Sequence, residues 1–391
     1  MKFDYVIVRF GGEIGVKRER TRRVFEGLLS NNMVKTLQHY GIQCQWITRR
    51  RGRIYVHTTN VKETTQRLTR VFGISSVSPA CKTSSDMDEI LGQTLKLARQ
   101  ILKSGSSFAI RCHRVGKHPY SSMDVSSKAG ETILANLKRR NLKVDLENPQ
   151  FTLNIEVRDR DAYIFTTKME GVGGFPLGSQ GKVACLLSGG IDSPVACWLA
   201  MKRGCPIIPI HFDIRPFTDE KATSKAADVA RRLFEWSIGF AKEMYFVPHG
   251  RNLEIFMKES PEALVCILCK RMMYRIAEIV ADKEKAEGIV TGEAIGEQAS
   301  QTLHNLRVLD QAVTQYPIHR PVLCFNKRET ENLARKISTF KISTRRSRGC
   351  SAVPRKPTTK AKLEDIMKAE EKFDIEEMIK ESIRKTRIVK I

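Results

Sequence analysis

The segment SGGIDS at residues 188–193 has the residue types of a phosphate-binding turn. Gly189 and Gly190 leave no side chain between backbone N–H groups and a ligand, and a helix that begins nearby adds the positive end of its dipole. The hydroxyls of Ser188 and Ser193 are further donors. Asp192 does not suit an anion by itself, but its carboxylate can hold a Mg²⁺ ion that also binds a phosphate oxygen. The pattern therefore predicts a site for nucleotide phosphates and Mg²⁺.

The sequence on either side of this segment predicts the elements that hold it. An apolar run at 183–187 precedes the glycines and a helical pattern at 194–203 follows them, which indicates a buried strand, a tight loop and a helix. Strands and helices then alternate, at 205–212, 219–238, 243–247, 264–285 and 288–290. This alternation predicts a doubly wound parallel sheet, whose ligands bind at the carboxyl ends of the strands. The alternative is an ordinary solvent-exposed Ser-Gly-Gly turn.

Cys266 and Cys269, in the sequence CILCKR, lie three residues apart in a helical pattern, so both thiols fall on one face of the helix. The pair can be buried apolar side chains, although the neighbouring Lys270 and Arg271 argue against inert thiols. A zinc site commonly needs two such pairs, and the sequence contains one. An iron–sulfur cluster can be held by this pair and one distant cysteine.

Cys350 is the distant cysteine that best fits such a role. Positive charges near a thiol lower its pKa and favour the thiolate. The charges that flank Cys350 in the sequence are Arg345, Arg346, Arg348 and Arg355. We therefore expect a reactive thiol at this position. The alternative is a cysteine in a basic RNA-binding loop, and Cys324 is the other candidate for the third thiol.

The chain as a whole predicts an α/β protein with a linker between its domains. Short α+β patterns fill the first part, and a Gly-rich segment separates them from the strand–helix alternation. A charged amphipathic pattern at 361–391 predicts a terminal helix. The boundaries that we expect are 1–73 for a ferredoxin-like domain, 74–170 for an RNA-binding α+β domain, 171–181 for the linker and 182–391 for the phosphate-binding domain.

Two basic segments in the first part are candidates for RNA contacts. Arg49 to Arg51 fall at a predicted hairpin tip between strands at 42–48 and 53–57. The sequence RCHRVGKHPYSS at 111–122 predicts a loop that offers positive charge and the ring of Tyr120 as a stacking surface. Such loops suit phosphate contacts and recognition of the shape of structured RNA. A basic loop that only faces solvent is the alternative.

These segments together resemble a known family. SGGIDS is similar to the PP-loop of ATP pyrophosphatases, which adenylate an oxygen and release pyrophosphate. FAIRCHRVGKHPYSS (108–122) and VDLENPQFTLNIEV (144–157) resemble the RNA-binding THUMP domain, and YVIVRFGGEIGVKRERTRRVFE (5–26) resembles the small domain that precedes it. In this order the segments are similar to the tRNA 4-thiouridine synthetases, or tRNA sulfurtransferases. The resemblance implies ATP-dependent synthesis of 4-thiouridine at position 8 of tRNA.

The resemblance also implies roles for individual residues. Asp192, Cys350 and Ser188 are the expected catalytic residues. Arg271 has in addition a physical argument, because a guanidinium near a phosphate stabilises developing charge. The residues expected to bind ATP and Mg²⁺ are Leu186, Leu187, Ser188, Gly189, Gly190, Asp192, Ser193, His211, Phe212, Arg271, Gly292 and Gln301.

The source of the sulfur divides the family that this chain resembles. Members with a C-terminal rhodanese domain carry sulfur as a persulfide, whereas members with a CxxC pair and no rhodanese domain use a cluster held by three cysteines. Only about forty residues follow Cys350, too few for a rhodanese domain. We therefore expect a [4Fe–4S] or [3Fe–4S] cluster on Cys266, Cys269 and Cys350. The rival is a Cys350 persulfide without a cluster, with sulfide or a cysteine desulfurase as the donor in either case.

Composition points to a polyanionic partner. The 391 residues carry a net charge of +24, which agrees with tRNA binding. The sequence has no signal peptide and no apolar run of membrane-spanning length, so we expect a soluble cytoplasmic protein without membrane contact. We also expect a homodimer, because an L-shaped RNA needs a wide binding surface. Two other functions stay open: a related PP-loop enzyme that thiolates another base or acts in thiamine thiazole biosynthesis, and an RNA-binding module with a decayed nucleotide site.

Overall fold

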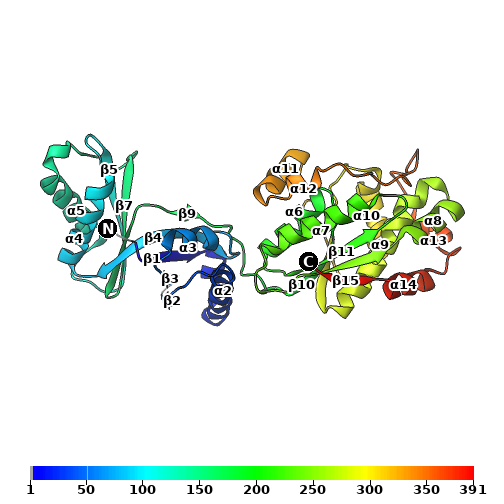
Figure 1. Ribbon diagram of the computed structural model, residues 1–391, viewed down its shortest axis with the longest axis horizontal. Helices are drawn as coiled ribbons and strands as arrows, with labels where there is room; N and C mark the ends of the chain where they lie inside the picture. Colours follow the sequence, from blue (N-terminus) through cyan, green and yellow to red (C-terminus); the bar gives the residue numbers. More distant parts are fainter. Residues whose placement is uncertain (1–2, 51) are drawn as a thin grey trace. The chain divides into compact units, whose positions relative to one another are not determined.

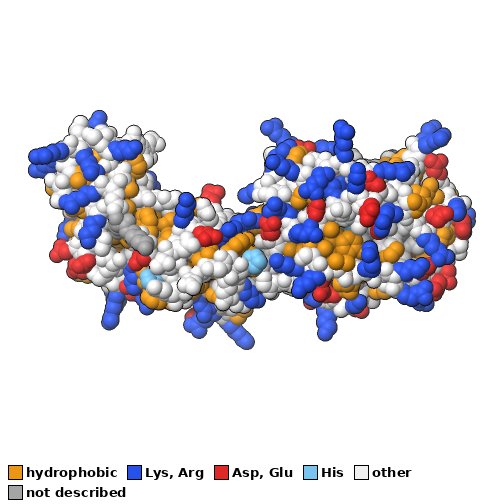
Figure 2. Space-filling view, viewed as in Figure 1, with side chains coloured by type: hydrophobic (Ala, Val, Ile, Leu, Met, Phe, Trp, Pro, Cys, Tyr) orange, Lys and Arg blue, Asp and Glu red, His pale blue; other side chains and the backbone are white. Residues whose placement is uncertain are grey.

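The computed structural model describes residues 3–50 and 52–391, and the chain divides into two compact units, Met1–Phe175 and Pro176–Ile391 (Figure 1). Each unit has its own sheet, which confirms the predicted α/β class. Lys and Arg side chains are spread over the visible face of both units (Figure 2). Within the described residues, no helix combines the length and the apolarity that a membrane span requires.

The first unit is built on one mixed sheet. Its strand order is β2-β3-β1-β4-β8-β7-β5-β6, and β9 pairs with β4. Strand β4 belongs to both halves of this sheet, because its residues 74–80 pair with β1 and its residues 81–84 pair with β8. The elements are β1 (Tyr5–Phe10), α1 (Gly12–Gly15), α2 (Glu19–His39), β2 (Trp46–Arg50), β3 (Arg53–His57), α3 (Val61–Leu68), β4 (Ile74–Ser84), α4 (Met87–Ile101), β5 (Ser107–Val115), α5 (Ser122–Asn136), β6 (Lys143–Val144), β7 (Phe151–Arg158), β8 (Asp161–Phe165) and β9 (Met169–Glu170).

A buried carboxylate joins the two halves of the first sheet. Glu156 on β7 pairs with Arg9 on β1 (2.6 Å), Arg53 on β3 (3.2 Å) and Arg158 (3.4 Å). Burial alone would raise the pKa of Glu156, but the three guanidinium groups outweigh it and lower the pKa. Because a buried charge is costly unless it is paired, this cluster favours one arrangement of the three strands.

The second unit has a six-stranded sheet covered by helices. The elements are β10 (Lys182–Leu186), α6 (Asp192–Lys202), β11 (Ile207–Asp213), α7 (Glu220–Phe234), β12 (Glu243–Pro248), α8 (Gly250–Glu259), α9 (Val265–Lys283), β13 (Ala286–Val290), α10 (Leu303–Asp310), β14 (Ile318–His319), α11 (Lys327–Lys336), α12 (Phe340–Ser343), α13 (Leu363–Glu370), α14 (Ile375–Arg384) and β15 (Arg387–Lys390). The strand order is β14-β13-β10-β11-β12-β15, and all neighbours are parallel except β12 and β15.

This strand order places a crevice beside β10. The chain starts in β10, runs outward through β11 and β12, and then returns to the other side of β10 with β13 and β14. The loops after β10 and β13 therefore leave neighbouring strands in a sheet whose order reverses there. Ligands of doubly wound sheets bind at this point, outside the carboxyl ends of the strands.

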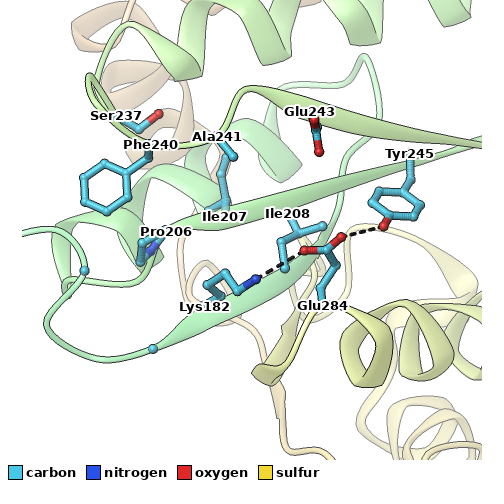
Figure 3. A pocket seen from close by; sticks show the side chains of 12 residues that line it. Lys182, Pro206, Ile207, Ile208, Ser237, Phe240, Ala241, Glu243, Tyr245 and Glu284 are labelled. Carbon is cyan, nitrogen blue, oxygen red and sulfur yellow. Dashed lines mark hydrogen bonds and ion pairs between the residues drawn. The ribbon is translucent and has the colours of Figure 1, made fainter. Parts of the chain in front are cut away.

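A different cavity lies at the amino ends of the same strands. It has a volume of about 340 Å³ and is lined at its polar end by Lys182, Tyr245 and Glu284 (Figure 3). Glu284 accepts hydrogen bonds from the Lys182 ammonium (3.2 Å) and from the Tyr245 hydroxyl (2.6 Å). None of the predicted site residues lines this cavity.

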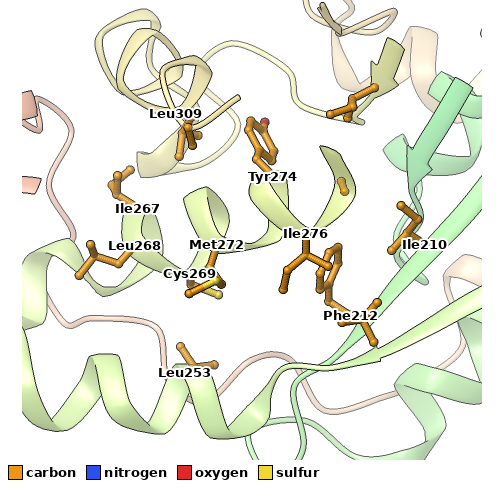
Figure 4. Close-up of a cluster of buried hydrophobic side chains, with 14 of the residues drawn as sticks. Ile210, Phe212, Leu253, Ile267, Leu268, Cys269, Met272, Tyr274, Ile276 and Leu309 are labelled. Atoms are coloured by element: carbon orange, nitrogen blue, oxygen red, sulfur yellow. The ribbon is translucent and has the colours of Figure 1, made fainter. Parts of the chain in front are cut away.

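Helix α9 forms the centre of the second unit's core. Leu268, Met272 and Ile276 are fully or almost fully buried on this helix, where they pack with residues such as Phe212 from the sheet (Figure 4). Cys269 belongs to the same buried cluster. The amino-terminal turn of α9 is thereby held firmly, and with it the two cysteines of the CILCKR sequence.

Three expectations about local structure were wrong. The segment 361–391 forms two helices and a strand, because residues 387–390 add β15 antiparallel to the edge strand β12. Residues 111–115, expected in a loop, extend β5 and pair with β7. The strand expected at 42–48 is β2, which includes Arg49 and Arg50, while Arg51 lies outside the described residues. Partner strands far away in the sequence decide the first two outcomes, whereas β2 pairs with its hairpin neighbour β3.

Candidate active site

The SGGIDS segment forms a tight loop between β10 and α6. Leu187 extends the strand by donating to the Ile210 carbonyl (2.8 Å). The Ser193 hydroxyl then accepts from the Ser188 N–H (3.0 Å), and the Gly190 N–H donates to the Ser188 hydroxyl (3.1 Å). The expected strand, loop and helix are all present, although the helix begins at residue 192 and not at 194. Asp192 therefore lies at the positive end of the helix.

The segment that follows β13 packs directly against this loop. A Cβ built on Gly292 would lie 2.5 Å from both the Cα and the N of Ser193, which is closer than real side chains come. Only glycine therefore allows the two backbones to approach each other in this way. The structure brings together Gly292 and the SGGIDS loop as the topology predicts.

Gln301 adds a buried acceptor to this part of the unit. Its backbone carbonyl accepts from the Gly296 N–H (3.1 Å), which closes the loop that begins after Gly292. Its side-chain Oε1 is buried and has no hydrogen-bond partner among the residues that the structure describes. Since buried polar atoms are normally satisfied, this oxygen is available to a ligand that donates a hydrogen bond.

Asp192 has a second carboxylate near it. Burial raises the pKa of Asp192, the charge of Glu297 raises it further, and the charge of Lys327 opposes both effects. Two neighbouring carboxylates with one nearby ammonium suit a divalent cation that is shared with a phosphate. In the described part of the chain, however, no group of three or more His, Cys, Asp or Glu side chains is close enough to enclose a metal ion.

His211 and Phe212, at the end of β11, lie behind the SGGIDS loop. The His211 Nδ1 atom is 3.2 Å from the Leu187 carbonyl, so it carries the proton and donates it there. Burial lowers the pKa of His211, which keeps the imidazole neutral. Phe212 is buried in the core, with its ring 5.5 Å from that of His249. Leu186 and Leu187 complete this wall, half-buried and buried respectively.

Arg271 has a structural pairing that the sequence did not suggest. Its guanidinium donates to both carboxylate oxygens of Glu370 on α13 (2.8 and 3.0 Å) and to the Val308 carbonyl. Arg275 binds the same carboxylate (2.7 and 2.8 Å). A contact from Arg271 to a phosphate would require these bonds to be exchanged, so the structure favours a role in holding α13 against α9.

Glu293 is a site residue that the sequence analysis missed. This buried carboxylate accepts from Lys270 (2.9 Å), Arg320 (2.8 Å) and the hydroxyls of Thr291 (3.1 Å) and Tyr274. Burial would raise the pKa of Glu293, but the charges of Lys270 and Arg320 outweigh it and lower the pKa to about 2. Because Glu293 follows Gly292 directly, this network fixes the backbone that contacts the loop. A charged residue after an apolar strand was the only sequence signal.

The segment that leads to Cys350 is attached to the SGGIDS loop. The Ser343 hydroxyl donates to the Gly190 carbonyl (2.9 Å). Lys225 of α7 donates to the Ser347 hydroxyl (2.8 Å), and its stem lies so close to Gly189 that a Cβ there would be 2.6 Å from the Lys225 Cε. Beyond Cys350, the Ser351 N–H donates to the Phe217 carbonyl (2.9 Å), which fixes the far side.

The expectation of a low pKa for Cys350 was wrong. Burial raises the pKa of the Cys350 thiol, partly opposed by a hydrogen bond from the Ala352 backbone. The arginines near Cys350 in sequence do not surround its sulfur: Arg345, for example, pairs with Asp228 on α7. Cys350 packs instead against the apolar core.

The three predicted thiols are close enough to affect one another's pKa, but over the ranges that the structure describes they are not close enough to hold a metal ion together. Cys266 and Cys269 occupy the first turns of α9, as expected. Burial raises the pKa of Cys266, and the charge of Cys350 raises it further; for Cys269 the causes are burial, then Cys266 and Cys350. Such mutual effects require that the sulfurs share one region. The spare candidate, Cys324, is exposed and has no such effect on them.

His249 gives Cys269 a hydrogen-bond partner. Its Nε2 atom is 3.3 Å from the Cys269 sulfur, and its Nδ1 atom is 3.3 Å from the Asn252 amide nitrogen. That amide also donates to Ser382 (2.9 Å), whose own proton goes to the Met378 carbonyl (2.9 Å). The amide nitrogen must therefore donate to Nδ1, which leaves the imidazole proton on Nε2, directed at the sulfur. Burial lowers the pKa of His249 to about 4.

Comparison with known proteins identifies the family. The family described as thiamine biosynthesis protein (ThiI) matches residues 178–375. A probable tRNA sulfurtransferase from Methanosarcina mazei is 38% identical over 99% of this chain and 96% of its own length, and one from Methanothermobacter thermautotrophicus is 38% identical over 98% and 97%. This chain belongs to the tRNA sulfurtransferase family. The resemblance inferred from the motifs is thereby confirmed.

A solved structure supports the same relationship across both units of this tRNA sulfurtransferase family member. It is described as a complex of a 4-thiouridine synthetase with RNA and bound ATP, is 33% identical, and matches 99% of each chain with a TM-score of 0.88. The THUMP domain matches residues 84–167, and the ThiI ferredoxin-like domain matches residues 5–78. Both matches fall within the first unit.

The basic segments of the first unit differ in how free their side chains are. Arg111, His113 and Lys117 are exposed along and after β5. Tyr120, in contrast, donates its hydroxyl proton to the Ser85 carbonyl and stacks on His118 with 5.4 Å between ring centroids. The ring that we expected to stack on RNA is therefore partly buried and in contact with the protein, and the exposed Arg111 and Lys117 are the better candidates for RNA contacts.

Proposed function

We propose that this chain is an ATP-dependent tRNA sulfurtransferase that makes 4-thiouridine at position 8 of tRNA. The observation that carries this proposal is the physical connection between the SGGIDS loop and the segment of Cys350, through Ser343 and Lys225. An enzyme that activates an oxygen with ATP and then replaces it with sulfur needs the nucleotide-binding loop and the thiol at the same part of the substrate. The RNA-bound and ATP-bound relative supports the same substrates.

The ATP site is proposed to be the crevice around the loop. Ser188, Gly189, Gly190 and Ser193 would hold the β- and γ-phosphates, because their N–H and hydroxyl groups face the start of α6. Asp192, with Glu297 nearby, would hold Mg²⁺. Leu186, Leu187, His211 and Phe212 would form the wall behind the nucleotide, Gly292 its edge, and the unpaired Oε1 of Gln301 would accept a hydrogen bond from the base.

The reaction is proposed to run in two steps. The uracil O4 attacks the α-phosphate and pyrophosphate leaves, while the N–H and hydroxyl groups of the loop stabilise its charge. A Mg²⁺ ion held by Asp192 would supply further positive charge there. A sulfur nucleophile then attacks C4, and AMP departs with the original oxygen. Activation is needed because a carbonyl oxygen is a poor leaving group, and holding both partners together supplies much of the remaining rate.

The sulfur is proposed to arrive through the three thiols. Cys266, Cys269 and Cys350 would hold a [4Fe–4S] or [3Fe–4S] cluster; their number, chemistry and shared location fit such a group, although the thiols must draw closer to do so. When bound, the cluster supplies iron for the transfer of sulfur that comes from sulfide or a cysteine desulfurase. Transfer from a Cys350 persulfide is the rival; burial raises the pKa of all three thiols, so these shifts do not distinguish the two routes.

A role in thiamine biosynthesis is the second candidate function. It is favoured by the description of the matching family alone. The two candidates differ in their products: nucleoside analysis of tRNA from a deletion strain would lack 4-thiouridine in the first case, and the strain would need a thiazole precursor in the second. A strain with neither defect would contradict both.

The proposal is tested most directly at Asp192. The Asp192→Ala variant should bind tRNA nearly as well as the wild type, because Asp192 lies in the nucleotide site, but it should release pyrophosphate at least a hundredfold more slowly. Pyrophosphate release with purified tRNA and the Kd for tRNA are the two measurements. Glu376→Gln, an exposed acidic residue of α14, serves as the control. Normal pyrophosphate release by Asp192→Ala would contradict the proposal.

A further inference from the structure

A basic hollow lies beside the SGGIDS loop in the second unit. It has a volume of about 420 Å³ and is formed by the start of α7 and the segment before Cys350. Four of the side chains that line it are cationic and one is acidic. The lining residues are Glu220, Lys221, Ser224, Lys225, Arg345 and Arg346.

Two of the four cations are held in place by the protein. Lys225 donates to the Ser347 hydroxyl (2.8 Å) and to the carbonyls of Ser343 (3.3 Å) and Arg345 (3.4 Å). The Arg345 guanidinium pairs with Asp228. These contacts fix both side chains, and in the part of the chain that the structure describes Lys225 is held by hydrogen bonds and not by an ion pair.

The other two cations have no such partner. Lys221 and Arg346 are exposed, and within the described residues neither has an ion pair or a side-chain hydrogen bond. Both line the hollow, and Lys221 lies in the first turn of α7, where the positive end of the helix dipole adds to its charge. A cavity lined by two fixed and two unpaired cations attracts a compact anion.

The hollow shares a wall with the loop that we propose to hold ATP. The Lys225 stem fills the space that a side chain at Gly189 would need, and Ser343, which begins the other wall, bonds to Gly190. An anion in the hollow would therefore lie next to the loop that we propose to hold ATP.

We propose that this hollow binds a phosphodiester of the RNA strand next to the nucleotide that reacts. The inference rests on the proposed function, since it places the RNA strand at the same site. Pyrophosphate has the same chemistry, but the SGGIDS loop already provides donors for it, whereas exposed Lys and Arg side chains suit a strand that approaches from solvent. The site would orient the target base between ATP and Cys350.

The test reverses the two unpaired charges. In the double variant Lys221→Glu/Arg346→Glu, the Kd for tRNA should rise at least tenfold, and the slope of log K against log salt should fall by about 1, the contribution of one phosphate contact. The control variant Lys368→Glu/Lys372→Glu changes the net charge equally at exposed positions outside the hollow. It should change the Kd less than threefold. Equal effects of the two variants, or an unchanged salt slope, would overturn the proposal.

Two further measurements identify the phosphate. A tRNA with a neutral methylphosphonate beside the target uridine should bind the wild type as weakly as the unmodified tRNA binds the double variant, and the two changes together should add nothing. Inhibition by pyrophosphate should be the same for wild type and double variant; weaker inhibition with an unchanged Kd for tRNA would assign the hollow to pyrophosphate and overturn the RNA assignment. Because binding is measured without turnover, an enzyme that makes no 4-thiouridine yet passes these tests would refute only the proposed function.

Discussion

Replacing Glu293 tests the structure closely, because the surroundings of this carboxylate set both the size and the pH dependence of its contribution to stability. The carboxylate is buried and accepts hydrogen bonds from Lys270, Arg320, Thr291 and Tyr274. In Glu293→Gln the side chain keeps its size and loses its charge, which leaves the two cations without a counter-charge. Removing one partner of a buried ion pair destabilises proteins by about 3–5 kcal/mol.

The pKa of Glu293 leads to a similar magnitude for its contribution to stability. Folding lowers the pKa of Glu293 from 4.5 to about 2. At about 1.4 kcal/mol for each pKa unit, this corresponds to roughly 3 kcal/mol of stability. Because the folded-state pKa is the lower one, this stability is present above pH 4.5 and is lost as the pH falls from about 4.5 to about 2.

Urea unfolding followed by tryptophan fluorescence measures this contribution. Trp198 and Trp236 lie in the second unit, and a Trp46→Phe background removes the signal of the first. At pH 7, Glu293→Gln should lower the free energy of unfolding by about 3 kcal/mol. The difference from the parent protein should shrink as the pH is lowered below 4.5.

Two results would refute this reasoning. One is an unfolding midpoint at pH 7 that Glu293→Gln leaves unchanged, and the other is a difference in stability at pH 2.5 that is as large as the difference at pH 7. The matched control is Glu376→Gln on α14, where the carboxylate is exposed and 3.9 Å from Lys380. Surface pairs of this kind contribute little, so the control should unfold like the parent.

Two further predictions concern the nucleotide site and the thiols. Gly292→Ala should weaken ATP binding at least tenfold, because the added Cβ would push on the backbone of Ser193. Equilibrium dialysis with ATP measures the affinity, and Gly349→Ala, where a Cβ would meet open space, is the control. Equal ATP affinities of the two variants would contradict the prediction. Anaerobically purified wild type should be brown and contain iron and sulfide, and Cys266→Ala should lose both the visible absorption and the iron; a colourless, iron-free protein that still makes 4-thiouridine would exclude the cluster.

Local sequence was enough for the SGGIDS loop. Glycines, hydroxyls and a carboxylate between an apolar strand and a helix leave few conformations open, and the strand, loop and helix form as predicted. The CxxC pair on α9 was predicted for the same reason, since helical spacing puts residues three apart on one face. These are short-range properties of the backbone, which a sequence can specify without knowledge of distant contacts.

Distant partners decided what the sequence left open or suggested wrongly. Four arginines beside Cys350 predicted a thiolate, yet the fold buries that thiol, and α7 takes up Arg345. Arg271, which we predict to contact ATP, pairs with Glu370, which lies 99 residues further along the chain, and nothing in the sequence indicated this pairing.

The sequence by itself determined the family, the strand, loop and helix around SGGIDS and most of the strand–helix alternation that follows, because each depends on residues that are neighbours in the chain. Only the tertiary structure decided which charges are neutralised, which thiols are buried and where a free basic hollow remains. The physical reason is that a charge or a sulfur takes its pKa and its partners from whatever the fold places within a few ångströms of it.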